Sequence, residues 1–153
     1  MPITQAAFSR DANGVPITNE GIITKKAVTF ANVAGQGATG TINLFTVTGL
    51  IIARVVGFCN TSLTGAATLE VGVTGSTAIC LAQIADAETL DVGEIYADAT
   101  VAKFEAMSDT VPPKVLVSTA IFATVGTTNI TAGQVDFYCI WNPISTNGNV
   151  AAA

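Results

Sequence analysis

The stretch AIFATVGTTNITAGQVDFYCIWNPI, residues 120–144, decides the fold class of this chain. Two runs of apolar, β-branched and aromatic residues flank a polar bend that contains Gly, and this pattern predicts two strands of a sheet. Side chains alternate along a strand, so one face of the second run is wholly apolar, and we expect it in the core: Val135, Phe137, Cys139 and Trp141. The other face is mixed, and we expect it to be half solvated or covered by another subunit: Asp136, Tyr138, Ile140 and Asn142.

The composition extends this prediction to the whole chain. Thr, Val and Ile make up about a third of the 153 residues, with 14 Gly and 5 Pro between the runs. A branched Cβ packs well on a pleated surface, so these residues favour strands. We therefore predict an all-β protein, a single-domain antiparallel β-sandwich that is jelly-roll-like and has about eight strands. Residues 22–153 form the sandwich, and residues 1–21, rich in turn residues, form an extended N-terminal arm.

Residues 22–30 are expected to form the first strand. Lys25 and Lys26 lie in its middle. Lysines suit an edge strand because charge blocks edge-to-edge pairing.

Residues 42–47 and 50–60 are expected to form an antiparallel pair around Thr48-Gly49. Alternation breaks between Leu44 and Phe45, which predicts a bulge or strong twist. Residues 50–59 are apolar on both faces, as in a central strand covered on each side. Arg54 is the one charge in that run. It either snorkels or pairs with an acid, or it is a charge at a subunit interface.

The charge content indicates an assembly. Charged residues are 11% and hydrophobic residues 50% of the chain, whereas an ordinary globular domain has about 25% charged residues. We favour burial of much of the surface between subunits over a monomer coated with Thr, Ser and Asn. The net charge of −5 argues against nucleic-acid binding, which needs a basic surface to replace counterions.

The sequence also predicts the cellular setting. No apolar run approaches the roughly 18 residues of a membrane span, and the N-terminus lacks the basic and apolar segments of a signal peptide. We expect folding in a cytoplasm and no membrane partner. The three cysteines, Cys59, Cys80 and Cys139, lie in apolar runs, which favours buried free thiols over disulfides.

Catalytic and ligand-binding signatures are missing. The chain has no His, which removes His-dependent catalysis and His metal sites. GQGATG, residues 35–40, is followed by a strand-like run, so we interpret it as a loop and not a nucleotide site. The acidic segment 86–109 fits a solvated loop better than a loose Ca²⁺ site among Asp86, Glu88 and Asp91. We predict no catalytic residue, no cofactor, no metal and no enzymatic activity.

Several stretches resemble a group of small virion proteins encoded by tailed bacteriophages. They are spread over most of the chain: FSRDANGVP at 8–16, VGFCN at 56–60, GEIYADAT at 93–100, NITAG at 129–133 and FYCIWNP at 137–143. None is a catalytic motif. An Arg often precedes the last Pro in such proteins, whereas Asn142 stands there in this chain.

The resemblance implies a structural protein of the phage head, a capsid decoration or cement protein on the capsid surface. Its partners would be the major capsid protein and further copies of itself, and a trimer would suit a three-fold axis. We name Arg10, Asp11, Asn13 and Arg54 as candidate capsid or subunit contacts. Two alternatives stay open: a tail or fibre component of the virion, and a bacterial β-sandwich module that binds carbohydrate.

Overall fold

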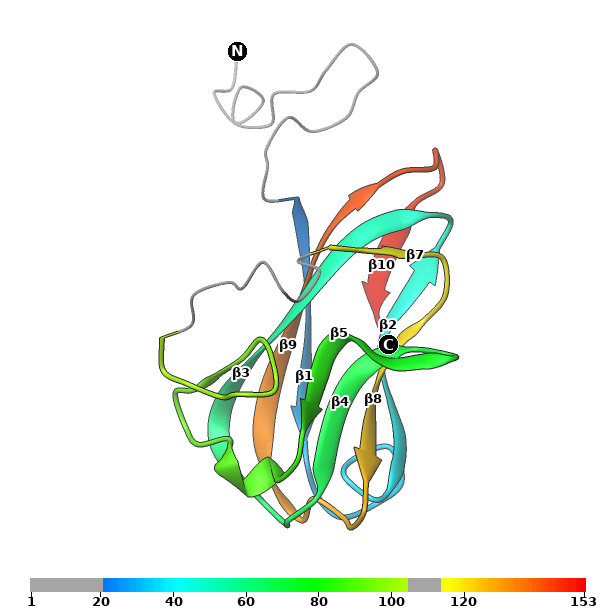
Figure 1. Ribbon diagram of the computed structural model, residues 1–153. Coiled ribbons are helices and arrows are strands. Elements are labelled where there is room, and N and C mark those ends of the chain that lie inside the picture. The colour runs from blue at the N-terminus through cyan, green and yellow to red at the C-terminus, as the bar shows by residue number, and fades with distance from the viewer. Residues whose placement is uncertain (1–20, 105–113) are drawn as a thin grey trace.

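The computed structural model describes residues 21–104 and 114–153. Ten strands and one 3-10 turn are found there (Figure 1). In chain order they are β1 (Ile22–Thr29), β2 (Gly40–Thr48), β3 (Ile51–Thr64), β4 (Thr68–Val73), β5 (Ser76–Ile84), η2 (Ala87–Thr89), β6 (Ile95–Tyr96), β7 (Val115–Val117), β8 (Ile121–Gly126), β9 (Ala132–Pro143) and β10 (Asn149–Ala152).

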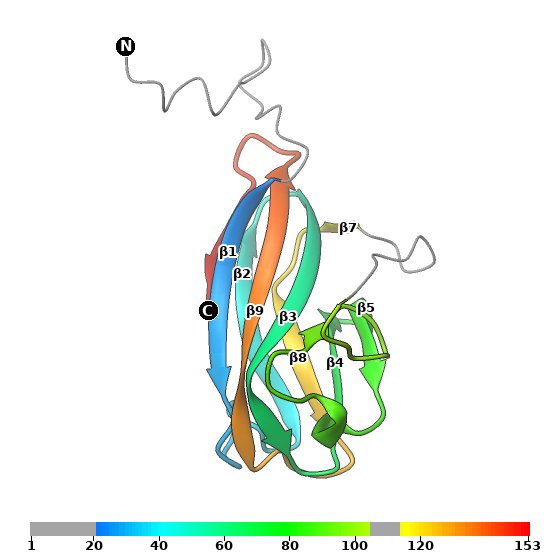
Figure 2. The same ribbon diagram turned by 90° about the vertical axis from the view of Figure 1, so that its left-hand side faces the viewer.

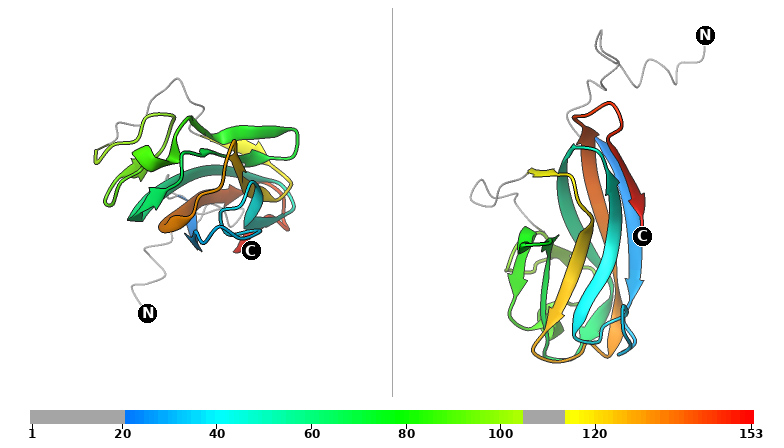
Figure 3. Two further views of the ribbon diagram at one scale, coloured as in Figure 1. Left: turned by 90° about the horizontal axis from the view of Figure 1, so that it is seen from below. Right: turned by 90° about the vertical axis from the view of Figure 1, so that its right-hand side faces the viewer.

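The strands form two antiparallel sheets that pack face to face, as the view from below shows (Figure 3, left). One sheet has the order β1-β9-β3-β6, with β7 also paired to β3. The other has the order β10-β2-β8-β4-β5. The all-β sandwich predicted from composition and alternation is confirmed. The jelly-roll topology stays a prediction, and the expected eight strands are exceeded by short ones such as β6 and β10.

The core lies between the sheets and follows the alternation of the strands. Val135, Phe137 and Cys139 are fully buried and Trp141 is 5% exposed, so the predicted inner face of β9 is confirmed. The Trp141 indole N–H donates to Thr24 Oγ1 at 3.0 Å, and the Thr24 hydroxyl donates to the Val150 carbonyl at 3.2 Å. This chain of hydrogen bonds links β9, β1 and β10 across the open side of the sandwich.

Two pairings expected from the sequence are wrong. Residues 42–47 and 50–60 do not pair, because β2 pairs with β8 and β10 whereas β3 pairs with β9, β6 and β7. Gly49, with φ of 66°, turns the chain from one sheet to the other, and Ser145 Oγ accepts the Leu50 N–H at 2.8 Å just beyond the turn.

The two runs of residues 120–144 also lie in different sheets, as β8 and β9. The intervening bend closes the end of the sandwich. Ile130 is fully buried there, and its N–H donates to the Gly37 carbonyl at 2.7 Å. The bend is therefore a connection between sheets and not a hairpin.

Other local predictions are confirmed. β1 is an edge strand, and the register of β2 against β8 shifts between Asn43 and Phe45, so that Leu44 and Phe45 are both buried. The glycine-containing segment 35–40 is a connection between β1 and β2. The three cysteines are free and buried.

Candidate interaction face

The outer face of the β1-β9-β3 sheet is rich in apolar side chains. In Figure 2 this sheet stands in front of β2 and β8, and no other described strand lies across it. Cross-strand partners share a face, so the register places one set of residues on this outer side, which we name the apolar face. It consists of Ile23, Lys25, Ala27, Ile52, Arg54, Val56, Phe58, Leu116, Asp136, Tyr138, Ile140 and Asn142.

The apolar side chains of this face remain in contact with solvent. Ile23 is 61%, Leu116 62% and Phe58 38% exposed. Ile140 and Val56 are half-buried between them. A contiguous exposed apolar surface on a β-sheet is a feature of interaction sites. The prediction that residues 50–59 are covered on both sides is not met within the described residues, because Phe58 is 38% exposed and Ile52, Arg54 and Val56 are only half-buried.

A small polar group lies within the apolar face. Lys25 Nζ is 2.5 Å from Asp136 Oδ2 and 5.6 Å from the centre of the Tyr138 ring. The hydrogen bond to Asp136 raises the pKa of Lys25 above its ordinary 10.5. The lysine side chain is half exposed, whereas Asp136 is only 6% exposed. The lysine thus covers a carboxylate that apolar neighbours exclude from water.

Two buried oxygens of β9 are left without a hydrogen-bond donor. They are Asp136 Oδ1 and Asn142 Oδ1, which find none in residues 21–104 and 114–153. A buried acceptor without a donor costs roughly 1–3 kcal/mol. A surface that docks here and offers donors beside its apolar groups would satisfy them.

Arg54 lies near the centre of this face, directly opposite Ile140 on β9. It is half-buried, and the described residues provide it with no ion-pair partner. The internal acid considered in the sequence analysis is therefore not found in this part of the chain. Arg54 is thus a half-buried charge of this face without a counter-ion in the described residues. Sequence reasoning had marked Arg54 as a candidate capsid or subunit contact.

The other three predicted contact residues lie in the part of the chain that the structure does not describe. Arg10, Asp11 and Asn13, and the rest of the predicted arm before Gly21, lie outside the described residues. The members of the apolar face that sequence reasoning missed are Ile23, Lys25, Ala27 and Leu116. Alternation within each run gave their faces, but only the pairing of β1 and β7 with this sheet brings them beside Arg54 and Tyr138.

The acidic segment has a structural role where it is described. Residues 87–89 form the short 3-10 turn η2, and Asp86 caps it by accepting the Glu88 N–H at 3.0 Å. Glu88 itself accepts the Gly65 N–H at 2.8 Å. Within residues 21–104 and 114–153, no His, Cys, Asp and Glu side chains gather as a metal site would require.

The cysteines are poor nucleophiles. Burial raises the pKa of Cys59 and of Cys80 from 9.0 to about 11, and that of Cys139 to about 12. Near neutral pH all three are therefore protonated thiols, which do not act as nucleophiles or metal ligands. Their arrangement matches thiols that pack in a core.

Comparison with known proteins adds no relative. No family model, curated protein or solved structure matches this chain. No helix in the described part of the chain is long and apolar enough to cross a membrane.

Proposed function

We propose that the protein is a non-enzymatic structural component of a bacteriophage virion that decorates and stabilises the capsid. The observation that carries the proposal is the apolar face, an exposed sheet surface with a central arginine and unmet acceptors. Its partners are other copies of this chain and the major capsid protein. The resemblance of several stretches to small phage virion proteins supports the setting, and the 11% charge content supports burial of surface in an assembly.

The fold offers little to the alternative of a carbohydrate-binding module. Sugar rings stack on exposed aromatic side chains, but the one Trp of the chain is buried at 5% exposure. Tyr96 is fully buried, and its hydroxyl lies within hydrogen-bond distance of two carbonyl oxygens, that of Leu69 at 2.9 Å and that of Ala82 at 2.7 Å, either of which accepts its proton. Tyr138 is half-buried beneath Lys25. Both Tyr side chains and the Trp are thus engaged in packing, and the exposed aromatic side chains of the described residues are Phe58 and Phe104, which carry no hydroxyl or N–H to bond a sugar.

The first experiment measures self-association of the purified protein. Light scattering after size exclusion is expected to give a mass above the 15.5 kDa of one chain. An apolar face of this kind favours association, because each Å² of apolar surface that is removed from water stabilises the complex by about 25 cal/mol. A monomer at high concentration that also fails to bind particles would contradict the proposal.

The second experiment locates the protein in the particle. Virions of the phage that encodes this chain are purified, and the copy number of the chain is compared with that of the major capsid protein. A decoration protein is expected in numbers comparable with the capsid subunits, and a cryo-EM map should place it on the capsid surface. A few copies at the tail would support the tail or fibre alternative, and absence from virions would overturn the virion proposal.

The predicted arm supplies a third experiment. A chain lacking residues 1–21 is expected to keep a cooperative melt but to bind less well to particles stripped of the protein, as measured by sedimentation. Ordering an arm costs roughly 1–2 kcal/mol per residue, so it orders only where a neighbour supplies contacts. Unfolding on truncation would show that the arm belongs to the core, and undiminished binding would place the contact elsewhere.

A further inference from the structure

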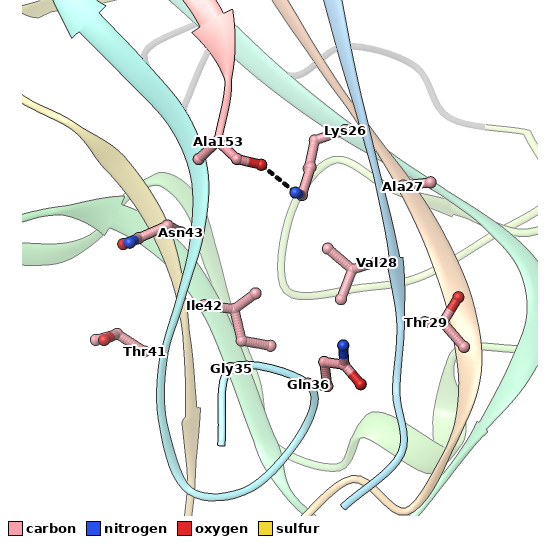
Figure 4. Close-up of a pocket in the computed structure, with 10 residues that line it drawn as sticks. All are labelled: Lys26, Ala27, Val28, Thr29, Gly35, Gln36, Thr41, Ile42, Asn43 and Ala153. Atoms are coloured by element: carbon pink, nitrogen blue, oxygen red, sulfur yellow. Dashed lines mark hydrogen bonds between the residues drawn. The ribbon is translucent and has the colours of Figure 1, made fainter. Parts of the chain in front are cut away.

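A groove on the open side of the sandwich lies between β1 and β2. It has a volume of about 460 Å³ and is lined by Lys26 to Thr29 of β1, Thr41 to Asn43 of β2, Gly35, Gln36 and Ala153. Figure 4 shows Val28 and Ile42 approaching each other across the space, with Lys26 and Gln36 at its two ends. The groove therefore has an apolar middle and polar ends.

The groove is a gap in the pairing of β2. The register pairs β10 with β2 only at residues 45–48, and the ladder stops where the Ala153 N–H donates to the Leu44 carbonyl at 3.0 Å. Beyond that point residues 40–44 of β2 pair on one side only, with β8, in the described chain. β1, on the other side of the groove, pairs only with β9. Unpaired strand edges of this kind accept an added strand.

The open stretch continues the line of an existing strand. β10 is short and already occupies the upper part of the β2 edge, so a strand placed after it would extend the same sheet. Open space lies beside Gly35 and beside Gly40, the first residue of β2, because a Cβ built on either meets nothing within 4 Å. Val28 and Ile42 would contact the side chains of that strand on its inner side.

We propose that this groove binds residues 3–8 of a second copy of the chain as an added β-strand. ITQAAF, residues 3–8, is a run without Gly or Pro that lies before the charged pair Arg10-Asp11. Residues 9–20 link this run to Gly21, and at about 3.3–3.6 Å per residue these twelve residues span roughly 40–43 Å when extended, enough to enter a neighbouring molecule. Six residues are enough to span residues 40–43 of β2, which lie beyond the Leu44 carbonyl that Ala153 already occupies.

A second copy is favoured over the chain's own N-terminus because of how the groove is closed. Between the start of β1 and the groove, the Thr24 hydroxyl bonds to the Val150 carbonyl and Lys26 Nζ bonds to the Ala153 carbonyl. A segment arriving from Gly21 of the same molecule would have to pass outside both contacts and turn back. A segment from a neighbour enters from the open side. The inference goes beyond the proposed capsid attachment and uses a different surface from the apolar face.

Cross-linking between two singly substituted full-length chains tests the proposal. One chain carries Ala6→Cys and the other Gln36→Cys at the end of the groove, and a short bismaleimide joins them. The control partner is Gln83→Cys, since Gln83 is also an exposed glutamine but lies on β5. The native cysteines are buried and serve as a silent background.

The expected result is a covalent heterodimer with Gln36→Cys at a yield several-fold above that with Gln83→Cys. Equal yields would overturn the proposal. So would a doubly substituted Ala6→Cys, Gln36→Cys chain that cross-links within itself at dilutions where the mixed chains do not react, because the occupant would then be the chain's own segment.

Hydrogen exchange supplies a test without cysteines. Ala6→Pro removes a backbone N–H from the proposed strand, and the amides of residues 40–44 that point away from β8 are expected to exchange several-fold faster in it than in the wild type at the same concentration. The control is Ala12→Pro, which lies in the same segment beyond residues 3–8. Unchanged exchange in Ala6→Pro, or an equal change in both variants, would overturn the proposal. Because the isolated protein is used, failure of the virion proposal leaves both results interpretable.

Discussion

The outer faces of the two sheets expose different kinds of side chain. The β1-β9-β3 sheet presents the apolar face. The β10-β2-β8-β4-β5 sheet, whose β2 (cyan) and β8 (yellow) face the viewer in the right-hand view of Figure 3, presents mostly polar residues. We name the second surface the polar face, and the register assigns to it Thr41, Asn43, Thr46, Thr68, Glu70, Gln83, Phe122 and Thr124.

The polar face meets its own hydrogen-bonding needs in part. Gln83 Nε2 donates to Glu70 Oε2 at 3.0 Å between neighbouring strands, whereas the buried Thr124 Oγ1 has no hydrogen-bond partner among the described residues. Both faces thus leave buried polar atoms without partners. The apolar face differs because it also exposes Ile23, Phe58 and Leu116 and leaves Arg54 without an ion pair in the described residues.

A substitution in the core that both sheets share should have the largest effect of the changes considered, and it acts on the free energy of unfolding. Trp141→Ala removes a buried side chain and its hydrogen bond to Thr24. We expect the free energy of unfolding to fall by about 3–5 kcal/mol, from lost burial and from the cavity left behind. Denaturant unfolding measures it. An unchanged midpoint would mean that the inner face of β9 is assigned to the wrong side.

Matched charges on the two outer faces test the comparison itself. Ile140 on β9 and Phe122 on β8 are both half-buried and lie on inner strands of their sheets. Ile140→Lys is expected to raise the dissociation constant of self-association about 100-fold, or ~2.7 kcal/mol, because a second positive charge directly opposite Arg54 would be buried in the contact. Phe122→Lys should leave it within a few-fold. Sedimentation equilibrium measures both, and equal effects would remove the distinction between the faces.

The pH dependence of stability reports on the interior, which both sheets share. Burial holds the pKa of Cys139 at about 12, against 9.0 ordinarily. The folded chain therefore keeps a proton that the unfolded chain loses, so this contribution is intact below pH 9 and declines as pH rises towards 12. One thiol accounts for about 1.4 kcal/mol per pH unit in that range.

Cys139→Ala should flatten this decline. Its cavity costs stability at every pH, but the slope between pH 9 and 11 is expected to become shallower than in the wild type. Lys25 and Tyr96, whose pKa values are also raised, titrate in both proteins alike. Denaturant midpoints over this range measure the slopes. Parallel curves would show that the thiol titrates as readily in the folded chain as in the unfolded one.

The sequence predicted faces better than it predicted partners. Alternation placed Val135 and Phe137 inside, and the break at Leu44 and Phe45 located the bulge, because these features depend only on the local period of a strand. The pairing of β2 with β3 and of β8 with β9 was predicted wrongly, since adjacent runs were assumed to form hairpins. The local sequence does not show whether a turn joins two strands of one sheet or connects two different sheets, as the turn at Gly49 and the bend at 127–131 do.

The candidate site was predictable to the same extent. Arg54 stood out as the single charge in an apolar run, and the mixed face of β9 suggested a cover. Burial of Asp136 arises only when Lys25 and Phe58 come from two other strands to either side of it. β10 was missed altogether because NVAA, residues 149–152, is too short to show a period.

The smallest expected effect belongs to Arg54, and it separates the two faces by their response to salt. Arg54→Ala should change the free energy of unfolding by no more than about 0.5 kcal/mol, because the described residues give the guanidinium no ion pair to lose. Self-association should weaken by a few-fold and become less sensitive to salt, since a charge at an interface acts mainly through screened electrostatics.

Arg54→Lys is the matched control, and it keeps the charge without the planar fork that binds an acceptor through two parallel hydrogen bonds. A salt dependence retained by Lys but lost in Ala would identify a simple charge contact, whereas loss in both would identify a paired acceptor of fixed geometry. If Arg54→Ala instead lowers the free energy of unfolding by more than about 1 kcal/mol while association is unchanged, the arginine stabilises its own sheet. It would then not be a contact to another molecule.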